Sequence, residues 1–240
     1  MNTPTLIAII AFAALIHASF QLGVSMLTLL SGHALGSKAR HRKVLNLMSS
    51  FTIGAMVMTA LLLSTIAYLA LMTYGTFAPP IAWSVACGIM TGVGVAVWVF
   101  YYRKGPGTAT WVPRPLANAL YNRVKQTEYA AEAFSLGLTG VLVEVAFTIA
   151  PLLAAGYSLV QLPQYLQLAA LIMYILIANA PLLIIITLVG GGHRISRIQK
   201  WREQNKRFLQ AAAGTALFVL GFFIYVNAVL APIWLKETLR

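Results

Sequence analysis

Long runs of apolar residues dominate the chain, and short polar or basic stretches separate them. A transmembrane helix needs about 20 consecutive apolar residues to cross a hydrocarbon core of about 30 Å. Six runs meet this requirement, and they cover residues 4–32, 45–72, 79–102, 133–157, 166–189 and 208–234. The pattern therefore predicts an all-α, polytopic membrane protein with six transmembrane helices, forming a single membrane domain over residues 1–240.

Positive charge alternates from one connection between these helices to the next. Of the 17 Lys and Arg, 15 lie in three stretches, at residues 38–43, 103–125 and 194–207. The two intervening connections, residues 73–80 and 156–164, contain no charged residue. Cytoplasmic loops carry the excess of Lys and Arg. We therefore expect a protein integral to the cytoplasmic (plasma) membrane, with basic loops in the cytoplasm and both termini outside.

Composition agrees with a lipid environment and excludes several other classes. Apolar residues make up 60% of the chain and charged residues 9%, whereas soluble domains have about 45–50% and about 25%. The net charge of +12 would suit nucleic-acid binding, but its position at helix ends makes it an orientation signal. No nucleic-acid partner is therefore expected. The single cysteine, Cys87, cannot form an internal disulfide.

The connection at residues 103–132 is long enough to have structure of its own. Three prolines interrupt its first half, and residues 116–125 then place apolar side chains at helical spacing opposite Arg123 and Lys125. We expect a short basic amphipathic helix there. It would lie on acidic lipid headgroups, or alternatively act as a gate or a docking helix for a partner.

Two of the apolar runs contain matching motifs. Residues 20–25 read FQLGVS and residues 134–139 read FSLGLT, an offset of 114 residues. Each copy begins a unit of three helices, which predicts repeat one at residues 4–102, a cytoplasmic linker at 103–132 and repeat two at 133–234. Because three is odd, the second unit enters the membrane from the opposite side. A 3+3 inverted-topology repeat of this kind is a common transporter plan; the alternative is coincidence in a chain rich in Leu, Gly and Ala.

The sequence AFSLGLTGVLVE at residues 133–144 resembles the fourth helix of the CcdA-like thiol carriers of cytochrome c biogenesis, which include DsbD-type proteins. Those carriers belong to the lysine-exporter (LysE-like) superfamily, so the resemblance implies a six-helix transporter fold. The carriers have a Pro-Cys pair where this chain has Gly140-Val141, and the symmetric position holds Met26-Leu27. Since both redox cysteines are absent, the resemblance does not carry the electron-transfer activity to this chain.

Polar residues inside the predicted spans are the candidates for chemistry. In the first span they fall at i, i+4, i+8 and i+11, which makes one stripe down a helix: His17, Gln21, Ser25 and Thr28. In the fourth span Ser135 and Thr139 share a face, and an adjacent face holds Gly137, Gly140 and Glu144. We expect these two sets of polar residues to line a common site.

Glu144 is the only acid well inside any predicted span. A charged carboxylate at the bilayer centre costs about 2.5–3.5 kcal/mol or more, so it should face the bundle and be partnered or protonated. We expect His17 to be its partner. Glu144 is then either the proton- or cation-coupling residue of a transport site or a protonated structural residue.

Proline and glycine residues mark expected helix breaks and close helix contacts. The sequence Asn179-Ala-Pro181 interrupts the fifth span, either as a discontinuous transporter helix or as a packing kink. Gly23, Gly137 and Gly140 are expected at hinges or close helix contacts. His17, His33 and Glu144 could ligate a divalent metal, but the chain lacks the dense clusters of such sites. No metal site is therefore assigned.

The leading functional prediction is a secondary transporter or exporter of a small solute, an amino acid or a cation, working by alternating access. The alternative is a non-transporting, degenerate CcdA-like module in envelope or thiol-related assembly. We expect no enzymatic activity and no cofactor, because the sequence offers neither a nucleophile–base pair nor a phosphate-binding loop. The expected partners are the lipid bilayer and a small-molecule or ion substrate, and the sequence leaves homo-oligomerisation open.

Overall fold

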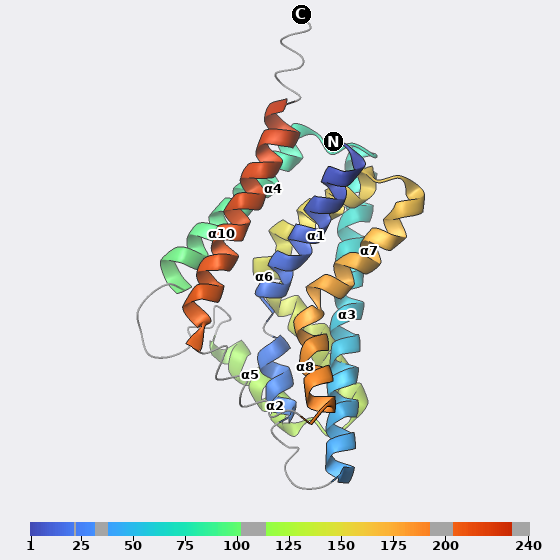
Figure 1. Cartoon of the computed structure of the whole chain (residues 1–240), viewed down its shortest axis with the longest axis vertical. Coiled ribbons are helices and arrows are strands. Elements are labelled where there is room, and N and C mark those ends of the chain that lie inside the picture. Colours follow the sequence, from blue (N-terminus) through green and yellow to red (C-terminus); the bar gives the residue numbers. More distant parts are fainter. Residues whose placement is uncertain (22, 32–37, 102–113, 193–203, 232–240) are drawn as a thin grey trace, which may run out of the picture.

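The computed structural model describes residues 1–21, 23–31, 38–101, 114–192 and 204–231, which are helical apart from short turns and contain no strand. Four helices are long and apolar enough to cross a membrane. They are α3 (Lys38–Tyr74), α4 (Pro80–Ala96) extended by the π-helix η2 (Val97–Tyr101), α6 (Ala130–Gln161), and α10 (Lys206–Ile224) extended by the π-helix η3 (Tyr225–Leu230). The prediction of an all-α membrane protein is confirmed at this level (Figure 1).

The fifth apolar segment is a broken helix. It consists of α7 (Gln164–Ala178) and α8 (Ala180–Gly190), which meet at 58° and together form a fifth candidate span. Asn179 leaves helical geometry at φ −97° and ψ 7°, and Pro181 lies in the first turn of α8. A proline there needs no backbone donor and favours a new helix start. The break predicted around residues 179–181 is therefore present.

The first apolar segment is broken as well, and here the prediction of one helix over residues 4–32 was wrong. The structure has α1 (Thr3–Ser19) and α2 (Gly23–Ser31) instead. Phe20 ends α1 by donating its backbone N–H to the His17 carbonyl. With 17 residues, α1 alone is shorter than the roughly 20 residues that a full crossing requires.

Local signals explain where other helices begin. The Asn2 side chain accepts the Thr5 backbone N–H at 3.1 Å and so caps α1. The Glu132 carboxylate accepts the backbone N–H groups of Glu128 and Tyr129, at 2.9 and 3.3 Å, and closes the first turn of α6. The predicted short helix of the linker is α5 (Arg114–Gln126), in which Val124 is buried while Arg123 and Lys125 are exposed.

Helices α3 and α6 run parallel and touch through glycine. A Cβ atom on Gly54 would overlap the Phe134 carbonyl, and one on Gly156, further along α6, would approach Ile66. A Cβ on Gly137 would overlap the Phe51 carbonyl oxygen and lie 2.8 Å from the Ala55 nitrogen. The backbones therefore approach as closely as small residues allow.

Helices α4 and α10 form an antiparallel pair, in which each helix packs against the π-helical end of the other (Figure 1). Glycines from both helices lie in the contact. A Cβ on Gly94 would come 3.4 Å from the Gly214 carbonyl oxygen, and one on Gly214 would overlap the indole of Trp98. The pair thus depends on a small residue in each helix.

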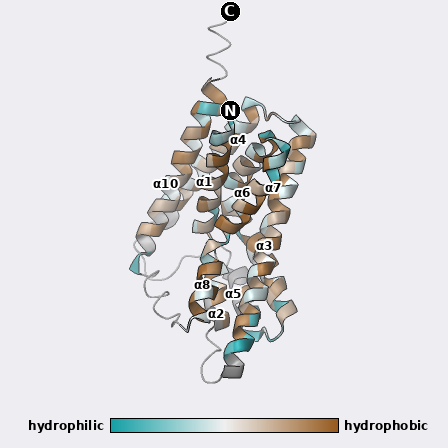
Figure 2. Cartoon of the chain, turned by 45° about the vertical axis from the view of Figure 1, so that its right-hand side comes forward, coloured by the Kyte–Doolittle hydropathy of each residue, from teal (hydrophilic) through white to brown (hydrophobic). Residues whose placement is uncertain are grey.

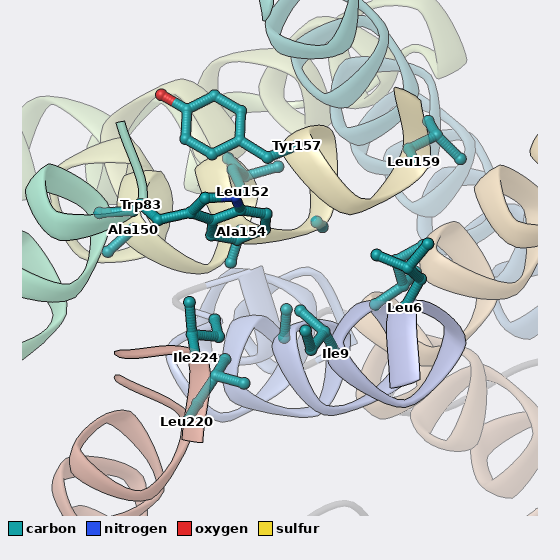
Figure 3. Close-up of a cluster of buried hydrophobic side chains, with 14 of the residues drawn as sticks. Leu6, Ile9, Trp83, Ala150, Leu152, Ala154, Tyr157, Leu159, Leu220 and Ile224 are labelled. Carbon is teal, nitrogen blue, oxygen red and sulfur yellow. The ribbon is translucent and has the colours of Figure 1, made fainter. Parts of the chain in front are cut away.

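Two hydrophobic cores are stacked along the long axis of the molecule. The upper core, at the end where α1 begins in Figure 1, draws on α1, α3, α4, α6, α7, α10 and η3. Figure 3 shows Ile9 of α1 pointing toward α6, with Leu220 and Ile224 of α10 beside it. The lower core draws on α2, α3, α5, α6 and α8. Figure 2 shows that hydrophobic residues continue along the outer faces of the helices, as expected of surfaces that meet lipid.

Candidate functional site

A layer of buried polar side chains separates the two cores. Along α3 the order is lower core to Ala55, then Thr59, then upper core from Leu63. The passage from one core to the other also occurs at polar residues in α6, at the junction of α1 and α2, and at the junction of α7 and α8. We call these residues the polar layer: His17, Gln21, Thr59, Glu144, Thr148, Tyr174 and Asn179. Their exposed fractions are 0–5%, so the layer is closed to solvent.

The two helix breaks are hydrogen-bonded to each other within this layer. Gln21, just after α1, donates its Nε2 to Asn179 Oδ1 at 3.1 Å. Asn179 Nδ2 donates to the Ile175 carbonyl at 2.9 Å and to Thr59 Oγ1 at 3.3 Å. A single side chain therefore links both breaks to α3.

The side chain of Glu144, from α6, reaches the N-terminus of α2. Its Oε1 accepts the backbone N–H of Gly23 at 2.9 Å, and the carboxyl group is 1% exposed. The first N–H groups of a helix have no intrahelical partner and carry partial positive charge, so they stabilise a carboxylate. The break in the first segment thus creates the environment that holds the acid.

His17 has a different partner from the expected one. Its Nδ1 lies 2.9 Å from Tyr174 Oη, and the two rings meet edge to face with centroids 5.8 Å apart. The described hydrogen bonds therefore place His17 with Tyr174 on α7 and Glu144 with Gly23 on α2. These two contacts lie one on each side of the first break, and the His17–Glu144 pair stays a prediction.

Three of the predicted site residues differ from the buried residues of the layer in their exposure. Ser25, Ser135 and Thr139 are exposed. Ser135 donates to the Ala131 carbonyl at 3.1 Å and Thr139 to the Ser135 carbonyl at 3.0 Å, so both hydroxyls bond within α6. The face of α6 that packs inward is the glycine face, because only it admits the α3 backbone.

The glycine and proline positions predicted as hinges or contacts lie around the layer. A Cβ on Gly23 would be 3.4 Å from the Phe51 ring, and one on Gly140 would be 3.5 Å from Met26 Sδ. Gly137 lies against the backbone of α3, and Pro181 begins α8. Both motif copies therefore come together beside Phe51, which contacts Gly23 and Gly137 alike.

Metal and thiol chemistry have little support among the described residues. They contain no group of three His, Cys, Asp or Glu side chains suited to a metal ion, and His33 lies outside them. Cys87 is buried in α4 and donates to the Gly221 carbonyl at 3.3 Å. This thiol therefore has a role in packing α4 against α10.

Sequence reasoning missed Tyr174, Thr59 and Thr148. Tyr174 lies five residues before Asn179, near the end of α7, and its position beside the break was the available signal. Searches for related proteins add nothing to this geometry: no protein-family model, curated protein or solved structure matches the chain.

Proposed function

We propose that this protein is a six-span secondary transporter of a small solute, with the polar layer as its substrate site and Glu144 as its coupling residue. One observation carries the proposal: two broken helices meet at mid-depth, and the only acid inside the apolar segments lies on the new helix start created by one break. Discontinuous helices that present their ends to a buried site are a recurring transporter arrangement.

The repeat of three helices is part of this proposal. The antiparallel contact of α4 and α10, each ending in a π-helix, is what a two-fold axis in the membrane plane would produce for the third helix of each repeat. The approach of Gly23 and Gly137 to the same Phe51 fits the first helices of the two repeats. These contacts support an inverted repeat of the LysE-like type.

The orientation in the membrane is proposed from charge. Helix α3 begins, and α5 lies, at the lower end of the molecule in Figure 1, and both helices contain basic residues, among them Arg42, Lys43, Arg123 and Lys125. Placing that end in the cytoplasm satisfies the positive-inside rule. The N-terminus and the end of η3 then face outward.

The mechanism follows from the two cores. In an alternating-access cycle the layer opens first to one side and then to the other, and the closed layer corresponds to an occluded state. Ionised Glu144 can accept the Gly23 N–H, whereas protonated Glu144 loses part of that stabilisation. Protonation would therefore change the balance between conformations, as coupling requires.

A non-transporting membrane module remains the second candidate, and the closed layer favours it. Every layer side chain is 5% exposed or less, and most are hydrogen-bonded within the bundle. In this second candidate, the layer has the structural role of fixing how the helices align with one another.

Reconstitution separates these candidates. Proteoliposomes containing the wild-type protein and a trapped pH indicator would be screened with amino acids and divalent cations under an imposed proton gradient. We expect one solute class to move, and Glu144→Gln to bind it without concentrating it. Glu128→Gln is the matched control, because Glu128 is an exposed acid just before α6. Wild-type rates in Glu144→Gln would end the coupling role, and no flux in the wild type would favour the module.

A further inference from the structure

We propose that the polar layer binds a monovalent cation such as Na⁺ where the two helix breaks meet, using Gln21 Oε1 and backbone carbonyls at the ends of α1 and α7, with Glu144 as the counter-charge. The inference rests on the proposed function and deepens it, since it names a second ion for the same site, but binding can be measured without transport.

The side chain of Gln21 has an unsatisfied oxygen inside the layer. Its side chain is 5% exposed, and its Nε2 is committed to Asn179 at the other break. The oxygen of the same amide therefore also lies in the layer, between the two breaks. Among the described residues this oxygen has no hydrogen-bond donor. A buried acceptor without a donor is costly, and a cation is one ligand that would satisfy it.

Two helices point their C-terminal ends at the layer. Helices α1 and α7 reach the layer from the upper core, and both end there. The last carbonyls of a helix carry partial negative charge. The His17 carbonyl accepts the Phe20 N–H and the Ile175 carbonyl accepts from Asn179, so the coordinating carbonyls would be others in the last turns. Two negative helix ends thus converge on the layer beside Gln21. Unwound carbonyls and half-helix C-termini are the groups with which transporters coordinate Na⁺.

The charge of the layer favours a monovalent cation. Glu144 supplies one negative charge when ionised, and the described residues place no second acid in the layer. One carboxylate with neutral oxygens balances a monovalent ion, whereas divalent sites use more charged ligands. An anion is disfavoured because Glu144 already holds the positive end of α2.

The test is ion-specific stabilisation of the purified protein. Thermal unfolding in detergent would be followed while NaCl replaces choline chloride at constant ionic strength, with KCl and LiCl as parallel series. We expect a saturable rise of Tm with Na⁺ that choline does not give. Gln21→Met keeps the length of the side chain but removes its oxygen, and should weaken the apparent Na⁺ affinity at least tenfold.

Gln167→Met is the matched control, because this amide donates to the Leu162 carbonyl away from the layer. It should keep the wild-type response to Na⁺. If Gln21→Met fails to fold, Glu144→Gln replaces it, since removal of the counter-charge should weaken binding similarly. An equal Tm of the wild type in NaCl and choline chloride would overturn the proposal, as would an undiminished Na⁺ response in both layer variants. Saturable Na⁺ binding without solute flux would contradict the transport function while leaving the cation site standing.

Discussion

The side-chain amides of Gln21 and Asn179 are hydrogen-bonded at 3.1 Å although 158 residues separate them in sequence. Each residue lies where an apolar helix stops and a second one starts in a new direction. The bond therefore joins two backbone irregularities that would each leave polar groups exposed to hydrocarbon.

Breaking this bond from either side should destabilise the protein, and the two effects should not add. Asn179→Leu removes three hydrogen bonds and Gln21→Leu removes one. We expect losses in the free energy of unfolding of about 1–3 kcal/mol for each variant. A double-mutant cycle in mild detergent should give a coupling energy of about 0.5–2 kcal/mol. Strict additivity would mean that the two amides do not interact.

The carboxyl group of Glu144 should matter for stability chiefly as an acceptor. Glu144→Gln keeps an oxygen for the Gly23 N–H, so its Tm should stay near that of the wild type in choline chloride. Glu144→Ala leaves that N–H unpaired and should cost about 1–3 kcal/mol. Glu128→Ala, at an exposed acid, serves as the control. Equal thermal stability of the Ala and Gln variants of Glu144 would argue against the observed contact.

The α3–α6 contact should be intolerant of a single methyl group. Gly137→Ala would drive a Cβ into the Phe51 backbone, which cannot move as a side chain can. We expect a loss of about 2–3 kcal/mol or a failure to accumulate in the membrane. Gly88→Ala in α4 is the matched control, since nothing lies within 4 Å of its Cβ. That variant should fall within about 1 kcal/mol of the wild type.

Sidedness can be read by labelling cysteines in a Cys87→Ser background, because Cys87 is the only cysteine. Thr76 lies in the exposed turn between α3 and α4, and Asn122 is exposed on α5. A membrane-impermeant maleimide added to intact cells should label Thr76→Cys and leave Asn122→Cys unmodified until the membrane is opened. Labelling of Asn122→Cys from outside would invert or refute the proposed topology.

The background variant carries a prediction of its own. Serine can donate to the Gly221 carbonyl as the Cys87 thiol does, so Cys87→Ser should preserve packing between α4 and α10. Solute flux in proteoliposomes should therefore equal that of the wild type. A loss of flux at normal protein abundance would reveal thiol chemistry that a lone cysteine does not suggest.

Much of the helical architecture was predictable because membrane crossing imposes long apolar runs, and the Asn179–Pro181 break followed from the chemistry of proline. The inward position of Glu144 followed from the cost of a charge in lipid. His17 and Gln21 were found by helical spacing, and both are buried.

The prediction of a polar stripe from helical spacing did not hold beyond Gln21. A stripe at i, i+4 and i+8 assumes one continuous helix, but the chain leaves helical geometry between Ser19 and Gly23. Residues after the break are rotated relative to those before it, which carries Ser25 to the surface. In α6 the helix is continuous, and the error lay in assigning hydroxyls to the interior. Thr139 satisfies its own hydroxyl within the helix, so it does not need the bundle.

The two stacked cores differ in how firmly they hold α4 and α10. The upper core includes α4 and α10, whereas the lower core draws none of its described residues from them. If α4 and α10 moved away from the other helices at the lower end, none of the described apolar contacts within the lower core would be lost. In a bilayer, lipid acyl chains rather than water would cover the surface exposed by this movement. The distance between this helix pair and the other helices at the lower end should then depend on the lateral pressure of the bilayer. Bilayer thickness and lipid tail composition should therefore influence how readily the protein changes conformation.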